Sequence, residues 1–525
     1  MFLPAAVLFL ASPSGAQVLL HDQTGSAAGD GLGVTAAIGD VTGDGKIDLA
    51  LGAPQAASGR GLVRVLSGAS FAVLFEVQGA VPGDHLGAAL APAGDVDGDG
   101  VPDILAGAPG AGQGAGAVRV LSGANGALLL SLPGSQAGAA LGHALAGGGD
   151  ADLDGVPDVL GGAPLWSATQ GSAEGQALLW SGDTGSLLHS VTGGAGDHLG
   201  QSIGGWNMGD GEPGEILGCS DDGNGGTGYV LVLSPADFSV LATVSGTQSA
   251  QRFGAAIARV GDANSDGIID LAVGAPGAGG SVALLSGLNF STLLTLTAPA
   301  TGTDFGGALG AVGDVNGDGK ADVAVGAPLS DRNGADAGAL TILSGTGGAV
   351  LYDVVGAQPG DRVGASMASL GDRDGDGRAE FAVGLPGADV AAADAGQVAI
   401  VSPTLWNTVE NGLPGVDGIP RLTGDGGLLG TTSATLSLQS ARPITGATLV
   451  VGLSLVLDAA NDVLVPMPDV VVTGLLTNSQ GGLEYDFTLL TGLPSGAVVY
   501  QQFLLADASA PGGVARSNTV AATVP

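Results

Sequence analysis

An aspartate-rich loop of one form recurs along this chain at intervals of about 55 residues. The form is Asp-x-(Asp/Asn/Thr)-x-Asp-Gly-x-x-(Asp/Glu). Six intact copies begin at Asp40, Asp95, Asp150, Asp262, Asp314 and Asp372. The interval between the third and fourth copies is doubled, and a damaged copy at Gly204–Glu215 lies in its middle. A fixed period of this size indicates a repeat architecture, so the spacing predicts seven units.

Each unit has room for four short strands around its loop. In the second unit we expect strands at 85–90, 104–109, 117–121 and 127–132, with the loop at 95–103 between the first two. Strands of this length joined by Gly, Asn and Asp turns are typical of a β-meander. Four-stranded antiparallel units arranged radially form a β-propeller. The predicted fold is therefore all-β, a seven-bladed β-propeller of four-stranded antiparallel blades.

The two ends of the repeat region complement each other. Residues 18–25, followed by 29–33, resemble the fourth strand at 73–79 and the turn that follows it at 83–87. The last unit ends at 397–402 and lacks a fourth strand of its own. We therefore expect the N-terminal strand to complete the last blade, which would close the ring and cover an exposed edge.

The first residues resemble a secretory signal peptide, assigned to 1–16. A short apolar run at Phe2–Ala11 precedes the small residues Ser14–Ala16, which offer a cleavage site. The run is too short to span a bilayer, and no later segment has 18 apolar residues without Gly, Pro or charge. The sequence thus predicts a secreted, periplasmic or cell-surface protein with no transmembrane segment.

The repeats end before the last quarter of the chain. The predicted propeller covers 17–403, and a stretch rich in Gly and Pro at 404–427 indicates a linker. From 428–525 polar and apolar residues alternate between regularly spaced turns. That pattern predicts a smaller all-β, β-sandwich-like C-terminal domain.

The charge of the chain is strongly negative and unevenly distributed. It has 50 acidic and 14 basic residues, a formal net charge of −36. Nucleic acid is excluded as a partner, because phosphate binding requires clusters of Lys and Arg. The six intact loops hold 21 of the 50 acids, so the loops are candidate metal sites.

The loop chemistry points to calcium. Ca²⁺ takes six to eight oxygen ligands, which side chains at loop positions 1, 3, 5 and 9 and the carbonyl at position 7 can supply. Position 6 is Gly in every intact copy, as a sharp turn with positive φ requires. Magnesium prefers fewer carboxylates, and zinc is poorly served by oxygen alone. We expect Ca²⁺ at about six sites.

The predicted ligands follow from these loop positions, with neutral oxygens at position 3 in three of the loops. They are Asp40, Thr42, Asp44, Lys46, Asp48; Asp95, Asp97, Asp99, Val101, Asp103; Asp150, Asp152, Asp154, Val156, Asp158; Asp262, Asn264, Asp266, Ile268, Asp270; Asp314, Asn316, Asp318, Lys320, Asp322; and Asp372, Asp374, Asp376, Arg378, Glu380. The damaged copy has Trp206, Met208 and Gly214 at ligand positions, so we expect it to bind no metal.

EF-hand and dockerin modules use similar loops, but they place a helix after the loop and a further acid at position 12. Here position 12 is apolar, as in Leu51 and Ala106, and a proline ends the short segment that follows. No helix fits between loop and proline, which argues against these modules.

Two further sequence features flank the loops. Leu86-Gly87, Phe253-Gly254 and Phe305-Gly306 precede a loop, and Gly-Ala-Pro follows one at 52–54, 107–109, 162–164, 274–276 and 326–328. Over 18–403 the chain resembles FG-GAP repeat proteins, of a bacterial secreted type, whose repeats build the seven-bladed propeller of integrin α subunits. It departs from the pattern at 218–220 and 384–386, and nothing in it resembles an integrin's inserted domain or legs.

The resemblance implies recognition of a protein or glycan ligand on the face opposite the calcium loops. Trp166, Arg332 and Arg60 are the candidate ligand-binding residues, because they lie in loops that differ between units. We expect a monomeric, secreted or cell-surface calcium-binding module for adhesion or ligand binding. No catalytic constellation is present, so no enzyme is expected. The alternatives are a propeller-scaffolded hydrolase or lyase acting on polysaccharide or phospholipid, and a purely structural envelope protein.

Overall fold

A computed structural model describes residues 18–402, apart from 148, 170, 205–215, 221–222, 235, 299–303, 317 and 374–377, and the strands of the C-terminal region. The chain divides into two compact units, which lie mainly in Leu20–Val401 and in Ser402–Pro525. The predicted signal peptide and the damaged loop fall outside the described residues.

The larger unit consists of seven four-stranded antiparallel sheets, here called blades 1 to 7. Blade 1 contains β2 (Val34–Ala37), β3 (Leu49–Ala53), β4 (Leu62–Leu66) and β5 (Val73–Gln78). Blade 2 contains β6 (Leu90–Gly94), β7 (Asp103–Gly107), β8 (Ala117–Leu121) and β9 (Leu128–Pro133). Blade 3 contains β10 (Leu145–Gly147), β11 (Val159–Ala163), β12 (Gln176–Trp180) and β13 (Leu187–Thr192).

The remaining blades repeat this order. Blade 4 contains β14 (Ser202–Gly204), β15 (Ile216–Ser220), β16 (Tyr229–Leu233) and β17 (Val240–Ser245). Blade 5 contains β18 (Ile257–Gly261), β19 (Asp270–Ala275), β20 (Ser281–Leu285) and β21 (Thr292–Thr297). Blade 6 contains β22 (Ala308–Ala311), β23 (Val323–Ala327), β24 (Ala339–Leu343) and β25 (Val350–Val355). Blade 7 contains β26 (Met367–Gly371), β27 (Glu380–Leu385), β28 (Gln397–Ser402) and β1 (Val18–Thr24).

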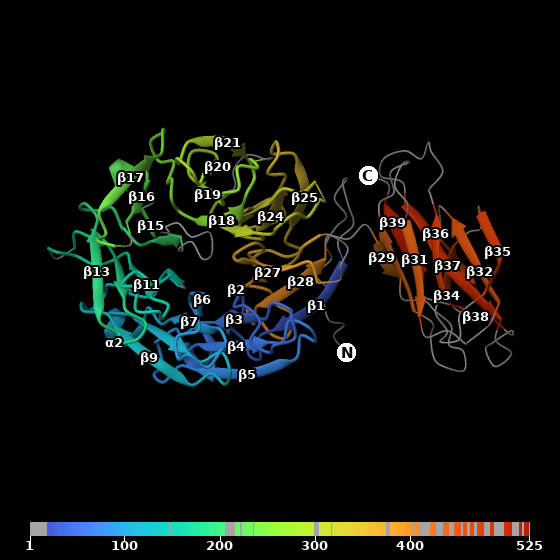
Figure 1. Ribbon diagram of the computed structural model, residues 1–525, viewed down its shortest axis with the longest axis horizontal. Coiled ribbons are helices and arrows are strands. Elements are labelled where there is room, and N and C mark those ends of the chain that lie inside the picture. The colour runs from blue at the N-terminus through green and yellow to red at the C-terminus, as the bar shows by residue number, and fades with distance from the viewer. Residues whose placement is uncertain are drawn as a thin grey trace. The chain divides into compact units, whose positions relative to one another are not determined.

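The blades are arranged around a centre. First strands of neighbouring blades contact each other in the cyclic order β2, β6, β10, β14, β18, β22, β26 and back to β2. Figure 1 shows the fourth strands, such as β5, β9, β13 and β17, on the periphery. This arrangement confirms the predicted all-β propeller of four-stranded antiparallel blades. The prediction that the N-terminal strand completes the last blade is also confirmed, because β1 pairs with β28.

Burial is greatest at the second strand of each blade and falls toward the fourth. All residues of β3, β7 and β19 are buried, whereas β5 and β17 expose every second residue and their first two residues. A strand covered by neighbouring blades on both faces has to be apolar throughout, and an outer strand has to be apolar on one face only. Apolar clusters therefore lie between adjacent blades, such as the one that joins Val63 and Val65 of β4 to Ile104 of β7.

The glycines of the flanking sequence features make close contact between blades. A Cβ on Gly107, the glycine of Gly-Ala-Pro in blade 2, would lie 2.0 Å from the carbonyl oxygen of Gly142 in blade 3. Gly116, which precedes β8, has φ +82° and forms a parallel bridge with Leu141 of the next blade. Equivalent bridges join Gly61 to Leu86, Gly175 to Leu199, Gly228 to Phe253, Gly338 to Val363 and Gly396 to Leu32. These sequence features therefore hold adjacent blades together.

The first strand of the second unit lies later in the chain than predicted. In blade 2 that strand is Leu90–Gly94 rather than 85–90, and His85 adopts a left-handed conformation with φ 57°. Leu86 is buried because it bridges to the preceding blade, so its apolar character reflects contact between blades rather than a strand. The third strand of the unit, Ala117–Leu121, has the predicted bounds.

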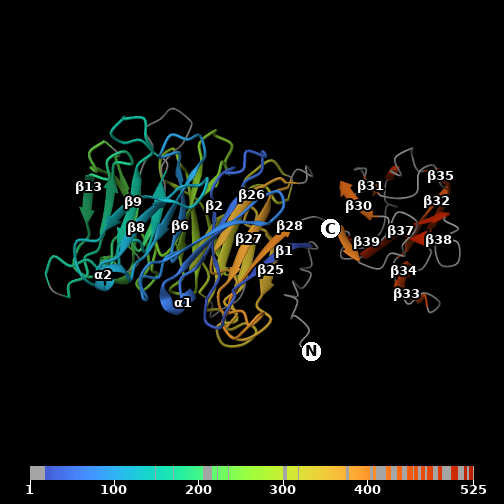
Figure 2. The same cartoon turned by 90° about the horizontal axis from the view of Figure 1, so that it is seen from below.

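Among the described residues, short turns follow three of the second strands, namely α1 (Ala56–Gly59), α2 (Ala111–Gly114) and α3 (Gly223–Gly226). In α1 and α2 the two middle residues have positive φ, so these turns are not regular right-handed helix. All three lie at the end of the second strand opposite the metal loop. Figure 2 shows α1 and α2 at the same edge of the propeller. The loops after the second strands thus share one face, and the metal loops share the other.

The C-terminal region has β-strands and no described helix. Its strands are β29 (Trp406–Val409), β30 (Arg421–Gly426), β31 (Ala434–Gln439), β32 (Gly446–Gly452), β33 (Leu455–Asp458), β34 (Val463–Pro466), β35 (Val470–Leu476), β36 (Leu483–Phe487), β37 (Val498–Ala506), β38 (Val514–Arg516) and β39 (Thr519–Thr523). They form sheets of six, three and two strands. Two of them, β29 and β30, fall in the range predicted as a linker. The sandwich arrangement and the domain boundaries stay predictions.

Replacing Gly116 with Ala should destabilise the propeller by about 2–5 kcal/mol. The new Cβ would lie 2.1 Å from the carbonyl oxygen of Leu141, and an L-residue at positive φ is strained as well. Gly138→Ala is the matched control, because its φ is +80° and no atom lies within 4 Å of the added Cβ. That variant should lose only about 1–2 kcal/mol. Equal losses in urea unfolding would contradict the close contact.

Candidate metal centres and binding face

The metal loops connect the first and second strands of their blades, and each folds around its first aspartate. In blade 2 the carboxylate of Asp95 accepts backbone N–H groups from Gly98, Asp99 and Gly100 at 2.8, 3.1 and 2.9 Å. The carboxylate of Asp99 accepts the N–H of Val101 at 2.8 Å. Side-chain oxygens thus replace the backbone acceptors that a helix or sheet would supply, and the loop turns tightly around them.

The same pattern recurs in the other described loops. The first aspartates Asp40, Asp150, Asp262 and Asp314 all accept the N–H of the glycine at loop position 6. Those glycines have positive φ, as predicted, at Gly45, Gly100, Gly155, Gly267 and Gly319. Gly377, at this position in the last loop, lies outside the described residues. The loops are therefore shaped by their own hydrogen bonds, with the acids gathered at one end of the propeller.

The acid at loop position 9 is buried, unlike the others. Asp103 is 0% exposed, and its two carboxylate oxygens accept N–H groups from Val96 at 2.8 Å and from Gly123 at 2.9 Å. Val96 belongs to the loop, whereas Gly123 belongs to the turn between the third and fourth strands. The same two bonds are made by Asp48, Asp158, Asp270 and Asp322. Position 9 therefore ties the loop to the outer half of its blade.

Burial raises the pKa of several of these carboxylates. It raises the pKa of Asp322 to about 7 and that of Asp158 to about 6, although backbone N–H groups partly offset it. Burial also raises the pKa of Asp103 and of Asp270. On the open side of the first loop the N–H of Gly45 is the largest favourable contribution, and the pKa of Asp40 is lowered. A cation in the loop would favour the charged form of the buried acids.

Two loops gather three carboxylates closely enough to share one ion. Oxygens of Asp95, Asp97 and Asp99 lie within 4.8 Å of one another in blade 2. Those of Asp150, Asp152 and Asp158 do so in blade 3. Both donor sets consist of hard oxygens, which suit Ca²⁺. Elsewhere in the described part of the chain no three acids come together in this way. Thr42, Asn264 and Asn316 occupy position 3 in three of the other loops, and their role as neutral ligands stays a prediction.

The last loop is described only in part. Asp374 and Asp376 fall outside the described residues, so their predicted role as ligands is not addressed. Asp372 is exposed, and Glu380 is 0% exposed. A carboxylate oxygen of Glu380 accepts the N–H of Arg373 at 2.7 Å, the bond that aspartate makes at this position elsewhere.

Basic side chains connect neighbouring loops, a feature that sequence reasoning missed. Lys46 Nζ donates to the carbonyl of Arg373 at 2.7 Å, across the junction between blades 1 and 7. Arg378 donates to the carbonyl of Val315 in blade 6 at 3.3 Å. The guanidinium of Arg373 also lies 4.2 Å from the ring centre of Phe71. Lys46 and Arg378 both occupy loop position 7, and their charge was the available signal.

Comparison with known proteins agrees with this geometry. The FG-GAP repeat family matches residues 32–66, 86–121 and 305–343, which lie in blades 1, 2 and 6. The chain contains FG-GAP repeats of the integrin α-like β-propeller. Relatives include integrin alpha-5 of Xenopus laevis, 31% identical over 36% of this chain and 20% of the relative. Integrin alpha-V of Gallus gallus is 33% identical, over 24% of this chain and 13% of the relative.

Human integrin alpha-8 is also similar, with 33% identity over 20% of this chain and 11% of that protein. The FG-GAP chain thus spans only a fifth or less of each of these three relatives. None of the helical segments in its described residues has the length and apolar composition needed to cross a bilayer.

The three candidate ligand-binding residues of the FG-GAP propeller lie on the face opposite the metal loops; Trp166 and Arg60 are partly buried, and Arg332 is exposed. Arg332 makes a bidentate ion pair with Asp353, at 2.7 and 2.5 Å, and Thr341 donates to the same carboxylate. Trp166 packs against the apolar cluster shared by blades 2 and 3. Arg60 donates to the carbonyl of Ala80. Their role in recognition stays a prediction, and Arg332 has a structural role that the sequence did not reveal.

Substitutions at loop positions 9 and 3 should behave differently. Asp103→Ala leaves the N–H groups of Val96 and Gly123 without acceptors, so it should cost about 2–4 kcal/mol even in chelator, and the loss of a proposed calcium ligand should add to that cost in calcium. Asp97→Ala removes an exposed carboxylate, so its loss should appear only when calcium is present. Thermal unfolding of both variants in each buffer measures the difference. Equal, purely calcium-dependent losses would contradict the anchoring role of Asp103.

Proposed function

We propose that this protein is an extracellular, calcium-stabilised, seven-bladed propeller that binds a ligand on the face opposite its metal loops. The observation that carries the proposal is the repeated loop, in which hydrogen bonds hold several carboxylates together at one end of each blade. Like charges held together are unfavourable unless a cation lies between them. A bound ion would offset both the mutual repulsion and the burial of the acid at position 9.

The negative net charge of the chain also supports calcium binding. Six divalent ions would change the formal net charge of −36 to about −24. The ligands would be the oxygens at positions 1, 3, 5 and 9 with the carbonyl at position 7, as proposed for all six intact loops. Full occupancy of each site at a hundredfold excess over its Kd would stabilise the fold by about 2.7 kcal/mol.

Secretion and ligand binding are proposed from the resemblance to integrin α subunits and from the predicted signal peptide at 1–16. The partner is a protein or a glycan, and the protein acts as a monomer. A structural envelope protein is the competing role. Arrays of glycans and matrix proteins separate the two, because specific binding that Trp166→Ala weakens supports recognition, whereas no binding supports a structural role.

The enzyme alternative has little support in the described residues. His85 and His198 occupy equivalent turns, both with positive φ, which is a repeated structural position rather than a catalytic one. Turnover of a polyuronide or a phospholipid by the purified protein would establish the alternative.

Removing calcium should lower the melting temperature by well over 10 °C. The slow hydrogen exchange of the backbone amides in the loops should be lost as well. Several sites could each contribute about 2.7 kcal/mol, and each 1 kcal/mol shifts the melting temperature of a domain this large by roughly 1 °C. Differential scanning calorimetry in calcium and in chelator, with metal counting by mass spectrometry, tests this expectation. Magnesium at the same concentration serves as the control for ionic strength.

Fewer than about four bound calcium ions, or a melting temperature that chelation leaves unchanged, would contradict the proposal.

A further inference from the structure

A cavity of about 350 Å³ lies between blades 4 and 5. Its walls come from the end of β17 with the loop that follows, and from β20, β21 and the loop before β20. Its volume lies in the range of about 300–1,000 Å³ that is typical of small-molecule sites. None of the described residues that line it is charged, and eight of them carry a hydroxyl or amide group, among them Ser245, Gln251, Ser281, Thr295 and Thr297.

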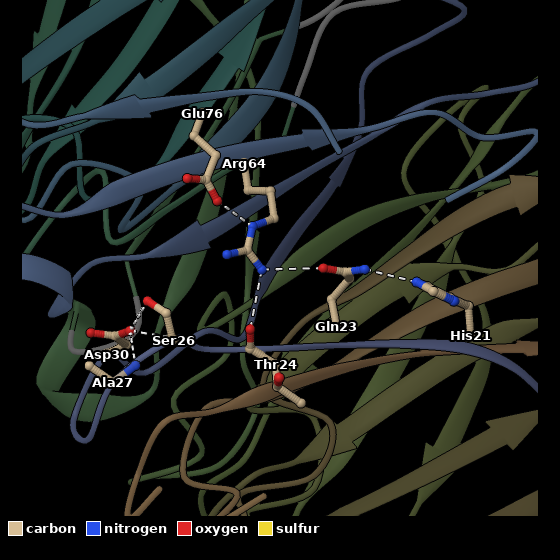
Figure 3. A network of polar contacts seen from close by, with 8 residues as sticks. All are labelled: His21, Gln23, Thr24, Ser26, Ala27, Asp30, Arg64 and Glu76. Atoms are coloured by element: carbon tan, nitrogen blue, oxygen red, sulfur yellow. Dashed lines mark hydrogen bonds and ion pairs between the residues drawn. The ribbon is translucent and has the colours of Figure 1, made fainter. Parts of the chain in front are cut away.

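The equivalent groove beside blade 1 is filled by an arginine. Arg64, the third residue of β4, donates to the side chain of Gln23 and to the carbonyl of Thr24 in β1, both at 3.2 Å. It also pairs with Glu76 across the sheet at 2.7 Å. Figure 3 shows the guanidinium between β1 and the neighbouring blade, with Glu76 on one side and Gln23 on the other. This groove is therefore closed by charged and amide side chains.

Strand register identifies the residues that replace this arginine and its partner in blade 5. Ala283 is the third residue of β20 and pairs with Thr295, as Arg64 pairs with Glu76. Ser245 ends β17, as Thr24 ends β1. In blade 5 a methyl group therefore stands where the guanidinium of Arg64 lies in blade 1, and a hydroxyl replaces the carboxylate of Glu76.

Besides the arginine and the glutamate, blade 5 also lacks the aspartate at the turn that borders the groove. Beside blade 1 the carboxylate of Asp30 accepts the N–H groups of Ser26 and Ala27 at 2.9 and 2.7 Å. At the equivalent turn beside blade 5, Gln251 Oε1 accepts two N–H groups, from Thr247 and Gln248, at 2.8 and 3.1 Å. The backbone contacts are retained with a neutral side chain.

The groove between blades 1 and 2 provides an internal comparison. It holds a cavity of about 290 Å³, which Asp84 and Arg119 line together with mainly apolar residues such as Leu86 and Leu128. Arg119 is the counterpart of Arg64 and Ala283, because it pairs with Ser131 in the same register. The absence of charge and the dense set of hydroxyl groups thus distinguish the cavity beside blade 5 from that beside blade 2.

We propose that the cavity between blades 4 and 5 binds a neutral saccharide. Several hydroxyl and amide groups can exchange hydrogen bonds with sugar hydroxyls, and the methyl group of Ala283 offers apolar surface to the C–H face of a ring. A carboxylated or sulfated sugar would find no cationic partner among the lining residues. The inference rests on the proposed ligand-binding function and narrows its ligand class to neutral glycan.

The test measures binding of lactose, maltose, cellobiose and chitobiose to the calcium-loaded full chain by saturation-transfer NMR and calorimetry, with glucuronic acid as the acidic comparison. At least one neutral sugar should bind, and glucuronic acid should not. Ala283→Arg introduces the long cationic side chain that blades 1 and 2 carry at this position, so it should occupy part of the groove and weaken binding by at least about tenfold. Thr295→Val, which removes a hydroxyl at nearly constant volume, should weaken it by about three- to tenfold.

Arg119→Ala is the matched control, because it alters the same strand position in blade 2, and sugar affinity should stay within about twofold. Each variant's melting temperature in calcium confirms that it is folded. The proposal is overturned if none of the neutral sugars binds, if glucuronic acid binds better than they do, or if folded Ala283→Arg binds as tightly as the parent. Calcium-dependent melting is measured on the same samples. It tests the calcium-stabilised propeller separately, so a failure to bind sugar does not contradict that proposal.

Discussion

A buried carboxylate at position 9 of each metal loop is the interaction on which the architecture of the blade depends. One oxygen of Asp103 holds the loop, and the other holds the turn between the third and fourth strands. The hairpin at the inner end of the blade is thereby joined to the hairpin at its outer end. The acids at positions 1 and 5 then shape the loop around the same point, so the residues that shape the loop are also the proposed metal ligands.

Small residues make the ring possible, and they also explain why the chain is so rich in glycine. Positions such as Gly107 and Gly116 lie so close to the next blade that no side chain fits there. With few large apolar residues available, the blades are held by backbone proximity, by thin apolar clusters and by the metal loops. Differences between blades are then confined to grooves and loops, where substitutions such as Arg64 in one blade and Ala283 in another change the surface without altering the fold.

Much of this was predictable from the sequence because the repeat period, the loop and the strand lengths are local features. The closing strand and the bounds of Ala117–Leu121 followed directly. The first strands did not, because the apolar residue Leu86 serves a contact between blades rather than a strand. Arg332 was predicted only as a candidate ligand-binding residue, and its ion pair with Asp353, 21 residues later in the chain, could not be predicted from the sequence. The cavity beside blade 5 depends on register across two blades, which no local pattern encodes.

The most direct test of the central claim is a crystal structure of the protein grown in calcium, with anomalous scattering measured to locate the ions. The account predicts anomalous peaks in the intact loops, each about 2.3–2.6 Å from oxygens at loop positions 1, 3 and 5, with the acid at position 9 still bonded to its two N–H groups. Loops that keep their shape with no ion among the carboxylates would contradict it.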